Sequence, residues 1–496
     1  MTDSVLDLRR PPADFDAAAR EALRLLGPAP ANWVPDQAGI DHNVFIVGGG
    51  QTGTAITHAL TRAGVGRVVV IDAAPDARRA GVWRNRARMQ QLRTLKSLVG
   101  PDLGVPGLSF QSWFEARHGQ EAYMQLDRIP RTAWADYLDW FREFLGIAVR
   151  YGTRLVRIEP VDAAGEVPAH LRLHLQIDGG TKIETARKLV LANGVAGNGA
   201  PYLPPALAAL RTTGRVWHTA DAIDFDALRG QTVAVVGGAA SAFDAAAVAL
   251  ESGAAAVHLF ARRDHIAATP IAKLRGYPGI YDHFPTLPDA VRWSVAVRWR
   301  RHGSTPPADS VQRVLAHANF HLHLASPWEQ AALEGGQVAV QLPGGETLAF
   351  DHVIAGTGYT SDPSHRPELA GVAEHVLRWG ERYTPPAPER DDELAASPYL
   401  GAGLEYLEKT PGAAPWLGNI HVYNPAGFAS VGLPLGDVPS LRRDVPALVR
   451  RISGDLLRAD WAQHEARIQG EVAPDYGLEL YGRALYRGPA ADTRAA

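Results

Sequence analysis

The sequence predicts an α/β protein in which one strand–turn–helix unit occurs twice. In each unit an apolar, β-branched run precedes a glycine-rich turn, and an alanine-rich stretch with helical character follows it. The two turns are Gly48–Gly53 and Gly237–Ala242. A turn of this kind directs backbone N–H groups and a helix N-terminus at a pyrophosphate. We therefore expect two Rossmann-like dinucleotide-binding domains, with the second inserted into the first.

The second strand of the first unit ends at an acidic residue. The strand Val68–Ile71 is followed by Asp72, about 20 residues after the last glycine of the turn, where such folds recognise a ribose. A carboxylate at this point accepts hydrogen bonds from the ribose hydroxyls and repels a 2′-phosphate. The first unit is therefore predicted to bind FAD, with turn contacts from Gly48, Gly50, Gln51 and Gly53.

The second unit has arginines where the first has its acid. The strand Val257–Ala261 is followed by Arg262 and Arg263, and a guanidinium matches the geometry of a 2′-phosphate. This predicts NADPH rather than NADH, with two solvated charges at a strand end as the alternative interpretation. Ala239 replaces the middle glycine, so we expect weaker or displaced binding. The expected turn contacts are Gly237, Ala239, Ser241 and Ala242.

Composition excludes several classes of function. A chain of 496 residues with 46% hydrophobic and 21% charged residues is expected to form two or three packed domains. The net charge of −3 offers no basic surface for nucleic acid, and no apolar run is long enough for a bilayer. The start of the sequence lacks a secretion signal, so we expect a cytoplasmic protein without nucleic-acid or membrane partners.

The sequence contains no cysteine. Disulfide reductases with a two-nucleotide architecture pass electrons to a pair of thiols, and that pair does not exist here. Thiolate metal sites and iron–sulfur clusters are excluded with it, and we predict no metal site. Electrons on the flavin are therefore expected to pass to dioxygen or to a diffusible partner.

Apolar patterns predict the remaining organisation. Aromatic and apolar residues at helical spacing over 131–145 indicate a helix face buried in the core rather than a substrate-binding surface. Two buried strands, 188–192 and 350–354, are interpreted as the exit from and the return to the first domain. Further predicted elements are the helices 15–26 and 439–452 and the strands 155–158, 171–177 and 420–423. The predicted domains are an N-terminal extension (1–41), the first part of the FAD-binding domain (42–220), the NADPH-binding domain with a lid segment (221–349), and the FAD-binding return with a C-terminal tail (350–496).

Four motifs in a fixed order resemble the two-dinucleotide (class B) flavin monooxygenases, which include flavin-containing monooxygenases, Baeyer–Villiger enzymes and amine N-hydroxylases. They are the first glycine turn, the linker Gly214–Thr219, the second turn with Asp244, and the motif Gly356, Thr357, Gly358 and Tyr359. The resemblance implies that NADPH reduces FAD and that dioxygen then forms a C4a-(hydro)peroxyflavin. It also implies cofactor contacts from the last motif.

The linker matches its family signature only at its Gly–His core, because Thr212 and Ala222 replace aromatic residues. The segment 89–99 is instead similar to ornithine and lysine N-hydroxylases. By that resemblance Gln91 lies beside the flavin and Lys96 holds the substrate carboxylate. The alternative is that both lie on an exposed helix face. Arg88 and Arg93 compete with Lys96 for the anchoring role.

Other candidate residues are less specific. His218 in the linker is interpreted either as a catalytic cofactor contact or as a satisfied structural histidine. Trp83 is assigned to the flavin site, and Gly436 and Asp437 are expected to bring backbone N–H groups against the flavin. The stretch from Lys273 to Trp293 is interpreted as a lid whose charges mostly face solvent. The predicted catalytic residues are Gln91, Lys96 and His218.

The sequence therefore predicts an FAD-dependent monooxygenase that uses NADPH and dioxygen and N-hydroxylates a small amine or amino acid. One alternative is sulfur or Baeyer–Villiger oxygenation. An alternative of another class is an NADPH-dependent flavoprotein reductase that passes electrons to a partner. The small-molecule substrate and dioxygen are the expected partners, and homo-oligomerisation is left open.

Overall fold

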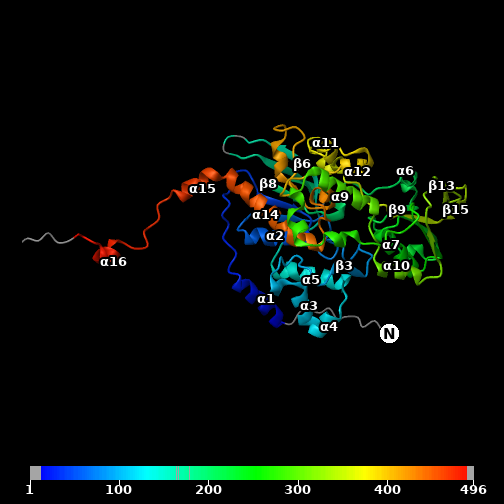
Figure 1. Cartoon of the computed structure of the whole chain (residues 1–496), viewed down its shortest axis with the longest axis horizontal. Coiled ribbons are helices and arrows are strands. Elements are labelled where there is room, and N and C mark those ends of the chain that lie inside the picture. The colour runs from blue at the N-terminus through cyan, green and yellow to red at the C-terminus, as the bar shows by residue number, and fades with distance from the viewer. Residues whose placement is uncertain (1–12, 164, 166, 178, 489–496) are drawn as a thin grey trace, which may run out of the picture.

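The computed structural model describes residues 13–163, 165, 167–177 and 179–488, which form a mixed α/β body with a C-terminal arm (Figure 1). The first sheet has the order β5-β2-β1-β8-β7-β6, with β17 paired to β8. Its β1, β2, β5, β8 and β17 run parallel, whereas β6, β7 and the first half of β8 form the predicted antiparallel meander. The strands are β1 (His42–Val47), β2 (Val68–Ile71), β5 (Val149–Arg150), β6 (Thr153–Val161), β7 (His170–Ile177), β8 (Gly180–Leu191) and β17 (Ile420–Val422).

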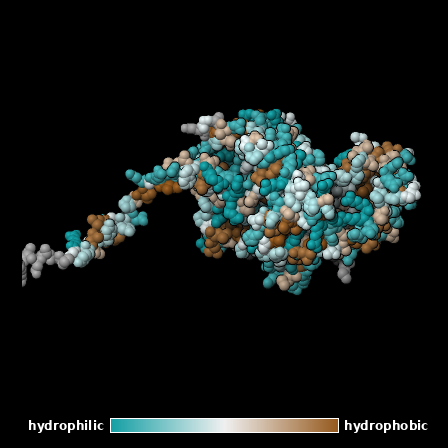
Figure 2. All heavy atoms as spheres, turned by 45° about the horizontal axis from the view of Figure 1, so that its top comes forward, coloured by the Kyte–Doolittle hydropathy of each residue, from teal (hydrophilic) through white to brown (hydrophobic). Residues whose placement is uncertain are grey.

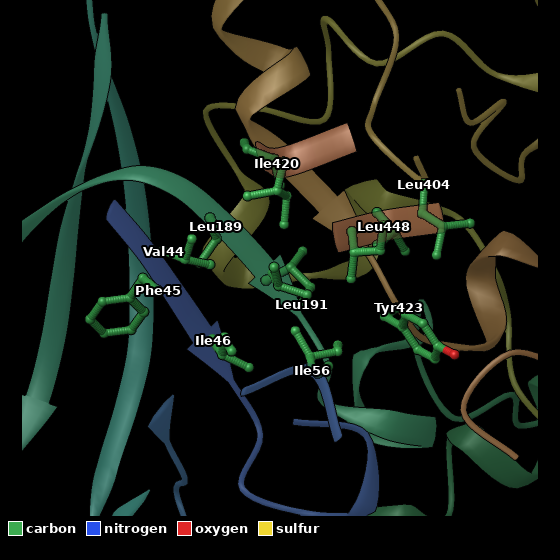
Figure 3. Close-up of a cluster of buried hydrophobic side chains, with 14 of the residues drawn as sticks. Val44, Phe45, Ile46, Ile56, Leu189, Leu191, Leu404, Ile420, Tyr423 and Leu448 are labelled. Atoms are coloured by element: carbon green, nitrogen blue, oxygen red, sulfur yellow. The ribbon is translucent and has the colours of Figure 1, made fainter. Parts of the chain in front are cut away.

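The centre of the first sheet, at β1, is buried on both faces, as a continuous apolar strand requires. Val44, Phe45 and Ile46 of β1 are fully buried, and Leu189 of β8 lies beside them (Figure 3). Helix α2 (Gln51–Arg62) follows β1, and α14 (Val438–Ala459) packs against α2. The predicted helix 439–452 is thus confirmed, although it extends to residue 459.

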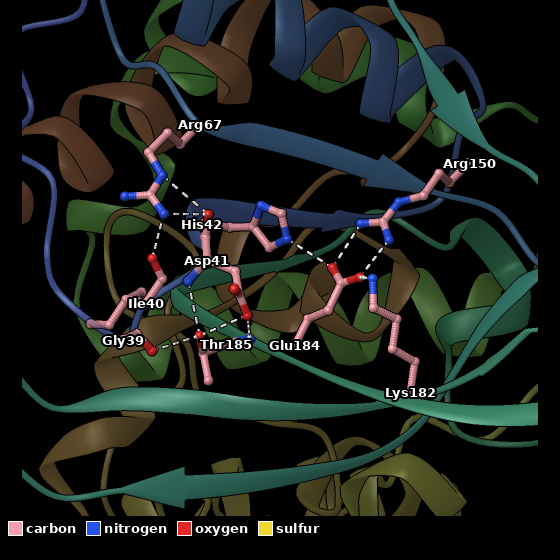
Figure 4. A network of polar contacts seen from close by, with 9 residues as sticks. All are labelled: Gly39, Ile40, Asp41, His42, Arg67, Arg150, Lys182, Glu184 and Thr185. Carbon is pink, nitrogen blue, oxygen red and sulfur yellow. Dashed lines mark hydrogen bonds and ion pairs between the residues drawn. The ribbon is translucent and has the colours of Figure 1, made fainter.

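A polar network fastens the first sheet at the end of β1 that lies away from its glycine turn (Figure 4). The Glu184 carboxylate accepts two hydrogen bonds from Arg150, at 2.6 and 2.8 Å, and pairs with His42 at 2.8 Å. These charge-assisted bonds, led by those from Arg150, hold the pKa of Glu184 well below its usual range. The network therefore belongs to the scaffold and lies outside the candidate site.

The second sheet is entirely parallel and has the order β12-β11-β10-β16-β9. Helix α7 (Ala240–Glu251) packs on one face, with α10 (Ala308–Leu315) against it, and a three-stranded antiparallel sheet covers the other. The parallel strands are β9 (Val216–His218), β10 (Thr232–Val236), β11 (Ala256–Phe260), β12 (Phe320–His323) and β16 (His352–Ala355). The antiparallel strands are β13 (Gln330–Glu334), β14 (Gln337–Gln341) and β15 (Thr347–Phe350).

The sheet membership of the predicted strand 350–354 differs from expectation. This segment was predicted to return to the first domain, but β16 pairs with β10 at the centre of the second sheet. The strand β9, which lies before residue 221, is also part of the second sheet. The second sheet therefore reaches beyond the predicted limits 221–349 on both sides.

An aromatic helical layer packs against the first sheet's helices. Trp113, Trp134 and Tyr137 are buried together in it, so the predicted core face of 131–145 is confirmed. Its helices are α1 (Ala13–Leu25), α3 (Phe110–His118), α4 (Gln120–Gln125) and α5 (Arg131–Phe144). Beside them β3 (Gln91–Leu95) pairs antiparallel with β4 (Arg128–Pro130), so the alternative of an exposed helix over this segment is wrong.

The predicted lid is packed rather than free. Trp293 is buried beside Trp379, and its indole N–H donates to the carbonyl oxygen of Glu389 at 2.9 Å. The remaining helices are α8 (Pro278–His283), α9 (Asp289–His302), α11 (Trp379–Arg382), α12 (Asp392–Ala395), α13 (Phe428–Val431), α15 (Trp461–Ile468) and α16 (Leu478–Tyr481). Within the described part of the chain, no helix has the length and apolarity needed to cross a membrane.

Candidate functional site

The first glycine turn connects β1 to α2. Gly48 has φ +115°, and a Cβ there would lie 2.3 Å from the carbonyl oxygen of Ala192. A Cβ on Gly53 would lie 1.9 Å from the carbonyl oxygen of Gly48, so helix and strand pack too closely for any side chain. Around Gly50, by contrast, the nearest atom to such a Cβ is the Gly81 Cα at 3.9 Å. Gly48 and Gly53 thus permit the packing, and Gly50 leaves the backbone open to a ligand.

Asp72 lies beside this turn, where the sequence placed it. Its Oδ2 accepts a hydrogen bond from the Gly49 N–H at 2.8 Å, and its Oδ1 accepts one from the Ala74 N–H at 2.8 Å. Each carboxylate oxygen can accept a further hydrogen bond, so a ribose hydroxyl could still be bound. The carboxylate therefore orients the turn in addition to any contact with a nucleotide.

Gln51 connects the first turn to two distant segments. Its side chain is buried; the amide Nε2 donates to the Gly436 carbonyl oxygen at 2.8 Å, and Oε1 accepts the Trp134 indole N–H at 3.1 Å. Asp437 caps α14 by accepting the Ser440 N–H at 3.0 Å, and burial raises the pKa of Asp437 to about 6. The predicted residues Gly436 and Asp437 are therefore brought against the first turn.

A cavity adjoins the first turn on the side of α5. Gly50, Gln51 and Trp83 line it together with Arg84 and Arg142. The Trp83 carbonyl oxygen accepts a hydrogen bond from Arg131, which also donates to the Met89 carbonyl oxygen at 3.0 Å. The predicted residue Trp83 thus lines the same cavity as the glycine turn.

The second turn repeats the close packing of the first. Gly237 has φ +137°, and a Cβ there would lie 2.4 Å from the Gly356 carbonyl oxygen. A Cβ on Gly356 would lie 2.7 Å from the Ala242 Cβ, so the motif that begins at Gly356 packs on the turn. Ala239 precedes α7 in an extended conformation, and Ser241 is exposed in the first turn of the helix. The predicted turn residues are therefore together at one strand end.

The two arginines after β11 differ in their partners. The Arg263 guanidinium donates to the His302 carbonyl oxygen at 2.5 Å and to that of Arg300 at 3.4 Å, and so caps the C-terminus of α9. Arg262 is exposed, and among the residues that the structure describes it has no hydrogen bond or ion pair. Arg262 is thus the arginine available to a phosphate.

His218 and the motif Gly356–Tyr359 meet at the end of β9 and β16. His218 is fully buried; its Nδ1 accepts the Ala220 N–H at 3.0 Å, and its ring lies edge-on to Tyr359 at 5.2 Å. Burial lowers the pKa of His218 and so favours the neutral imidazole. The Thr357 hydroxyl donates to the carbonyl oxygen of Tyr202. These contacts are structural, and they place His218 at the carboxyl edge of the second sheet.

Gln91 is the first residue of β3, and Lys96 directly follows its last residue. Gln91 is exposed at its start, whereas the Lys96 ammonium donates to the carbonyl oxygens of Tyr123 and Met124, at 2.6 and 3.0 Å. Lys96 also lies over the Tyr123 ring, 4.7 Å from its centre. These bonds cap the C-terminus of α4, a role that the sequence pattern did not indicate.

Two residues at the site were missed or given another role. Trp134 was assigned only to the core, although its indole N–H orients Gln51. Arg88 was considered only as a substrate anchor, but it donates to the carbonyl oxygens of Thr219 and Asp221. Neither role has a local sequence signal, because the partners lie far away along the chain.

Comparisons of sequence and of structure with known proteins each find monooxygenases or hydroxylases. A family model for L-lysine 6-monooxygenase/L-ornithine 5-monooxygenase matches residues 85–304. The FAD-dependent urate hydroxylase of Xanthomonas campestris pv. campestris is 38% identical over 451 residues, which cover 90% of this chain and 93% of that protein. The solved ornithine hydroxylase of Pseudomonas aeruginosa, in its reduced form, has a TM-score of 0.63 at 20% identity and covers 85% of this chain and 100% of that chain.

A second solved structure has the same fold. The ornithine N-hydroxylase of Kutzneria sp. 744, solved with reduced FAD, NADP⁺ and L-ornithine, has a TM-score of 0.63 at 17% identity and covers 84% of this chain and 99% of that chain. The shared α/β fold and the curated relative define an oxidoreductase of the flavoprotein class. This chain belongs to the two-dinucleotide flavin monooxygenase family, as the motif resemblance predicted.

Proposed function

We propose that FAD binds at the first glycine turn and NADPH at the second, each at the carboxyl ends of a parallel sheet. Each sheet is then the core of one Rossmann-like domain. The NADPH-binding domain, inserted in the FAD-binding domain, runs from about residue 214 to 357, because β9 and β16 belong to its sheet. This proposal replaces the narrower limits 221–349.

The N-termini of the helices at the two turns also suit the binding of a dinucleotide. Helices α2 and α7 begin within the two glycine motifs, at Gln51 and at Ala240, and neither helix has a side chain that caps its N-terminus. Free N–H groups at a helix N-terminus favour an anionic group such as a pyrophosphate. In this proposal Gly50 admits the pyrophosphate of FAD, and the exposed Arg262 binds the 2′-phosphate of NADPH.

Bound FAD, once reduced by NADPH, supplies the activation of dioxygen. The chain's own residues position and enclose the reacting groups. Gln51 and Trp134 fix the loop at Gly436 against the first turn, and buried His218 supports the end of the second sheet. Gln91 is exposed at the start of β3, where its amide is free to bind the flavin edge or the substrate.

We infer that the substrate is a urate-like purine, a planar molecule that is hydroxylated by one oxygen atom of dioxygen. The observation that carries this proposal is the 38% identity to a urate hydroxylase across 90% of this chain. A second observation supports it: Lys96, the expected anchor of an amino-acid carboxylate, is already bound to two carbonyl oxygens of α4. A urate-like substrate does not require that anchor.

N-hydroxylation of an amino acid is the second candidate function. The family model over residues 85–304 supports it, as does the spacing of Gln91 and Lys96. In this case Lys96 would have to exchange a carbonyl oxygen for the substrate carboxylate. The amine must also be neutral to react, so burial in the site would have to lower its pKa.

One assay separates these candidates. The holoenzyme is supplied with NADPH and dioxygen and offered urate, L-ornithine or L-lysine, while NADPH loss, peroxide release and product mass are measured. We expect urate alone to give a product heavier by one oxygen atom, with little peroxide. Hydroxylated ornithine or lysine would instead support the second candidate. Peroxide as the sole product with all three would contradict both and favour a flavoprotein reductase.

Replacement of Lys96 also distinguishes a urate-like substrate from an amino-acid substrate. Lys96→Met should leave the KM for urate within about twofold and lower the melting temperature, because α4 loses its cap. Lys182→Met, which removes an exposed lysine beside Glu184, is the matched control. A rise of tenfold or more in the KM for an amino acid, at an unchanged melting temperature, would establish Lys96 as the substrate anchor.

A further inference from the structure

Three arginines hold the 430–434 segment, each through a hydrogen bond from its guanidinium to a carbonyl oxygen of that segment. The segment includes the end of α13 and leads to Gly436, whose carbonyl oxygen accepts the Gln51 amide of the first turn at 2.8 Å. The arginines therefore act on a part of the chain that belongs to the candidate site. The pairs are Arg292 with Ser430, Arg275 with Gly432 and Arg443 with Pro434.

Arg275 differs from the other two arginines because no carboxylate balances its charge. Arg292 pairs with Asp289, and both carboxylate oxygens of Asp444 accept hydrogen bonds from Arg443. Among the residues that the structure describes, no acidic side chain makes a hydrogen bond or an ion pair with Arg275. Removing a guanidinium from water without a counter-charge is costly. Arg275 is therefore suited to bind an anion from outside the chain.

The free donors of Arg275 lie along one edge of its guanidinium. Nη2 is buried without a hydrogen-bond partner in the described chain, and Nε has no partner there either. The N–H bonds along this edge are parallel, so they match two neighbouring acceptor atoms of a planar anion. The Trp299 ring covers one face of the guanidinium, with its centre 4.5 Å from Cζ. The edge is thus the part of Arg275 that remains for a ligand.

The electrostatic surroundings of Arg275 are positive. Burial, together with the charge of Arg298 on α9, lowers the pKa of Arg275 to about 10. Arg275 nevertheless keeps its charge at neutral pH, and Arg298 has no ion pair among the described residues. Two cations in this arrangement attract an anion and repel the ammonium group of an amino acid.

The chain from Ile266 to Arg275 runs from the second turn to the 430–434 segment. A Cβ on Gly238 of the second turn would lie 3.3 Å from the Ile266 Cδ1. At the other end, Arg275 donates its hydrogen bond to the 430–434 segment. Arg275 therefore lies between elements of the two proposed nucleotide sites.

The guanidinium of Arg275 lies close to the molecular surface. Arg275 is half-buried, and its neighbours Leu274 and Tyr277 are 67% and 51% exposed. Exposed apolar residues occur in small patches over the face of the molecule shown in Figure 2, so Leu274 and Tyr277 do not by themselves mark a site. The observation that marks the site is the unbalanced guanidinium beside them.

We propose that Arg275 binds the anionic edge of the purine substrate through its Nε and Nη2 donors. This inference rests on the proposed function, in which the substrate is urate-like. Urate is negatively charged at neutral pH, and its edge carries neighbouring ring nitrogens and carbonyl oxygens that suit a bidentate guanidinium. Arg275 thus supplies the anchoring charge, whereas Lys96 is bound to two carbonyl oxygens of α4.

The test measures urate binding to the oxidised holoenzyme through the change in the flavin spectrum, together with steady-state kinetics. Arg275→Gln keeps a donor for Gly432 but loses the charge, so we expect the Kd and the KM for urate to rise about tenfold or more. The kcat should fall less than about threefold, and the KM for NADPH should stay within about twofold. Binding of xanthine, a purine that is mainly uncharged at neutral pH, should also stay within about twofold. Arg275→Lys, which keeps the charge but not the fork, should recover part of the affinity for urate.

Arg298→Gln is the matched control, because Arg298 is exposed and makes no hydrogen bond or ion pair in the described chain. It should leave the Kd for urate within about twofold, since an exposed charge is screened by water and salt. An effect of Arg298→Gln equal to that of Arg275→Gln would overturn the proposal, because the general positive charge rather than a contact would then bind urate.

The remaining outcomes separate this inference from the proposed function. A parent chain that neither binds nor hydroxylates urate would overturn both. Equal Kd values for urate in the parent and in Arg275→Gln would overturn the inference alone. An equal loss of urate and xanthine binding, or a rise in the KM for NADPH without a loss of urate binding, would also overturn it, because Arg275 would then support its segment or bind the nucleotide. If Arg275→Gln does not fold, Arg275→Lys decides, because an unchanged Kd for urate in that variant would contradict a bidentate contact.

Discussion

The Arg88 guanidinium donates to the Thr219 carbonyl oxygen at 2.6 Å and so ties the loop before β3 to the linker after β9. It also donates to the Asp221 carbonyl oxygen at 3.2 Å and lies over the Phe225 ring. In return, Arg313 of α10 donates to the Arg88 carbonyl oxygen at 3.0 Å. One residue thus connects the flavin side of the proposed site to two elements of the second sheet's domain.

Loss of Arg88 should slow the transfer of hydride while leaving FAD bound. Arg88→Ala removes two charge-assisted hydrogen bonds that relate the two proposed domains, and misplacement by about 1 Å can slow a reaction a hundredfold. We expect the rate of anaerobic flavin reduction at saturating NADPH to fall 10- to 100-fold, with an unchanged FAD content. Arg88→Lys, which keeps the charge, should recover part of the rate. A loss of FAD equal to the loss of rate would contradict a positioning role.

Arg262 and Arg263 should respond differently to replacement. Arg262→Ala removes the free guanidinium and should raise the KM for NADPH about tenfold, with little effect on NADH. Arg263→Ala removes the cap of α9 and should lower the melting temperature with a smaller effect on either KM. Steady-state kinetics with NADPH and with NADH measure the two KM values, and thermal unfolding measures the melting temperature of each variant. Equal effects of Arg262→Ala on NADPH and NADH would refute the 2′-phosphate role.

Gly50 and Gly53 provide a matched pair for the proposed FAD site. Gly53→Ala places a Cβ against the Gly48 carbonyl oxygen, so we expect a poorly folded or strongly destabilised protein. Gly50→Ala meets open space in the chain itself, so the apoprotein should keep its melting temperature. If a pyrophosphate passes Gly50, that variant should hold FAD at least tenfold more weakly. Full FAD retention by Gly50→Ala would place the cofactor elsewhere.

Local patterns predicted much of the fold and of the two turns. An apolar strand, a glycine turn and a helix are neighbours in sequence, so Gly48 and Gly237 could be placed at strand ends without knowledge of the rest. The helix 131–145 was likewise predicted from the helical spacing of its own apolar residues. Strand β16 was misassigned because sheet membership depends on pairing with β10, about 120 residues away, and no local pattern encodes that partner.

Side-chain partners were harder to predict than positions. Lys96 and Arg263 were both selected as ligands for anions, yet each caps the C-terminus of a helix that is remote in sequence. A cation with free donors satisfies backbone carbonyl oxygens as readily as a substrate, and sequence spacing does not distinguish the two. Their proposed contacts with ligands remain predictions.

Acid should destabilise the protein in part through His58 of α2. His58 is 7% exposed and packs edge-on against Phe141, and burial, aided by the charge of Arg62, lowers its pKa to about 4. The unfolded chain binds a proton near the ordinary histidine pKa of about 6.5, so it binds protons more readily than the folded chain between these values. The contribution of His58 to the free energy of unfolding is therefore fully present above about pH 6.5. It is lost as the pH falls toward 4, which lowers the free energy of unfolding by up to about 3 kcal/mol.

Replacement of His58 by an apolar residue should remove this loss. We expect the fall in melting temperature between pH 7.5 and pH 4.5 to be smaller by several degrees in His58→Leu than in the parent chain. The exposed His283, changed to Leu in the same way, is the control and should leave the pH dependence unaltered. An identical fall in His58→Leu and in the parent would mean that His58 is charged in the folded protein, which its burial against Phe141 argues against.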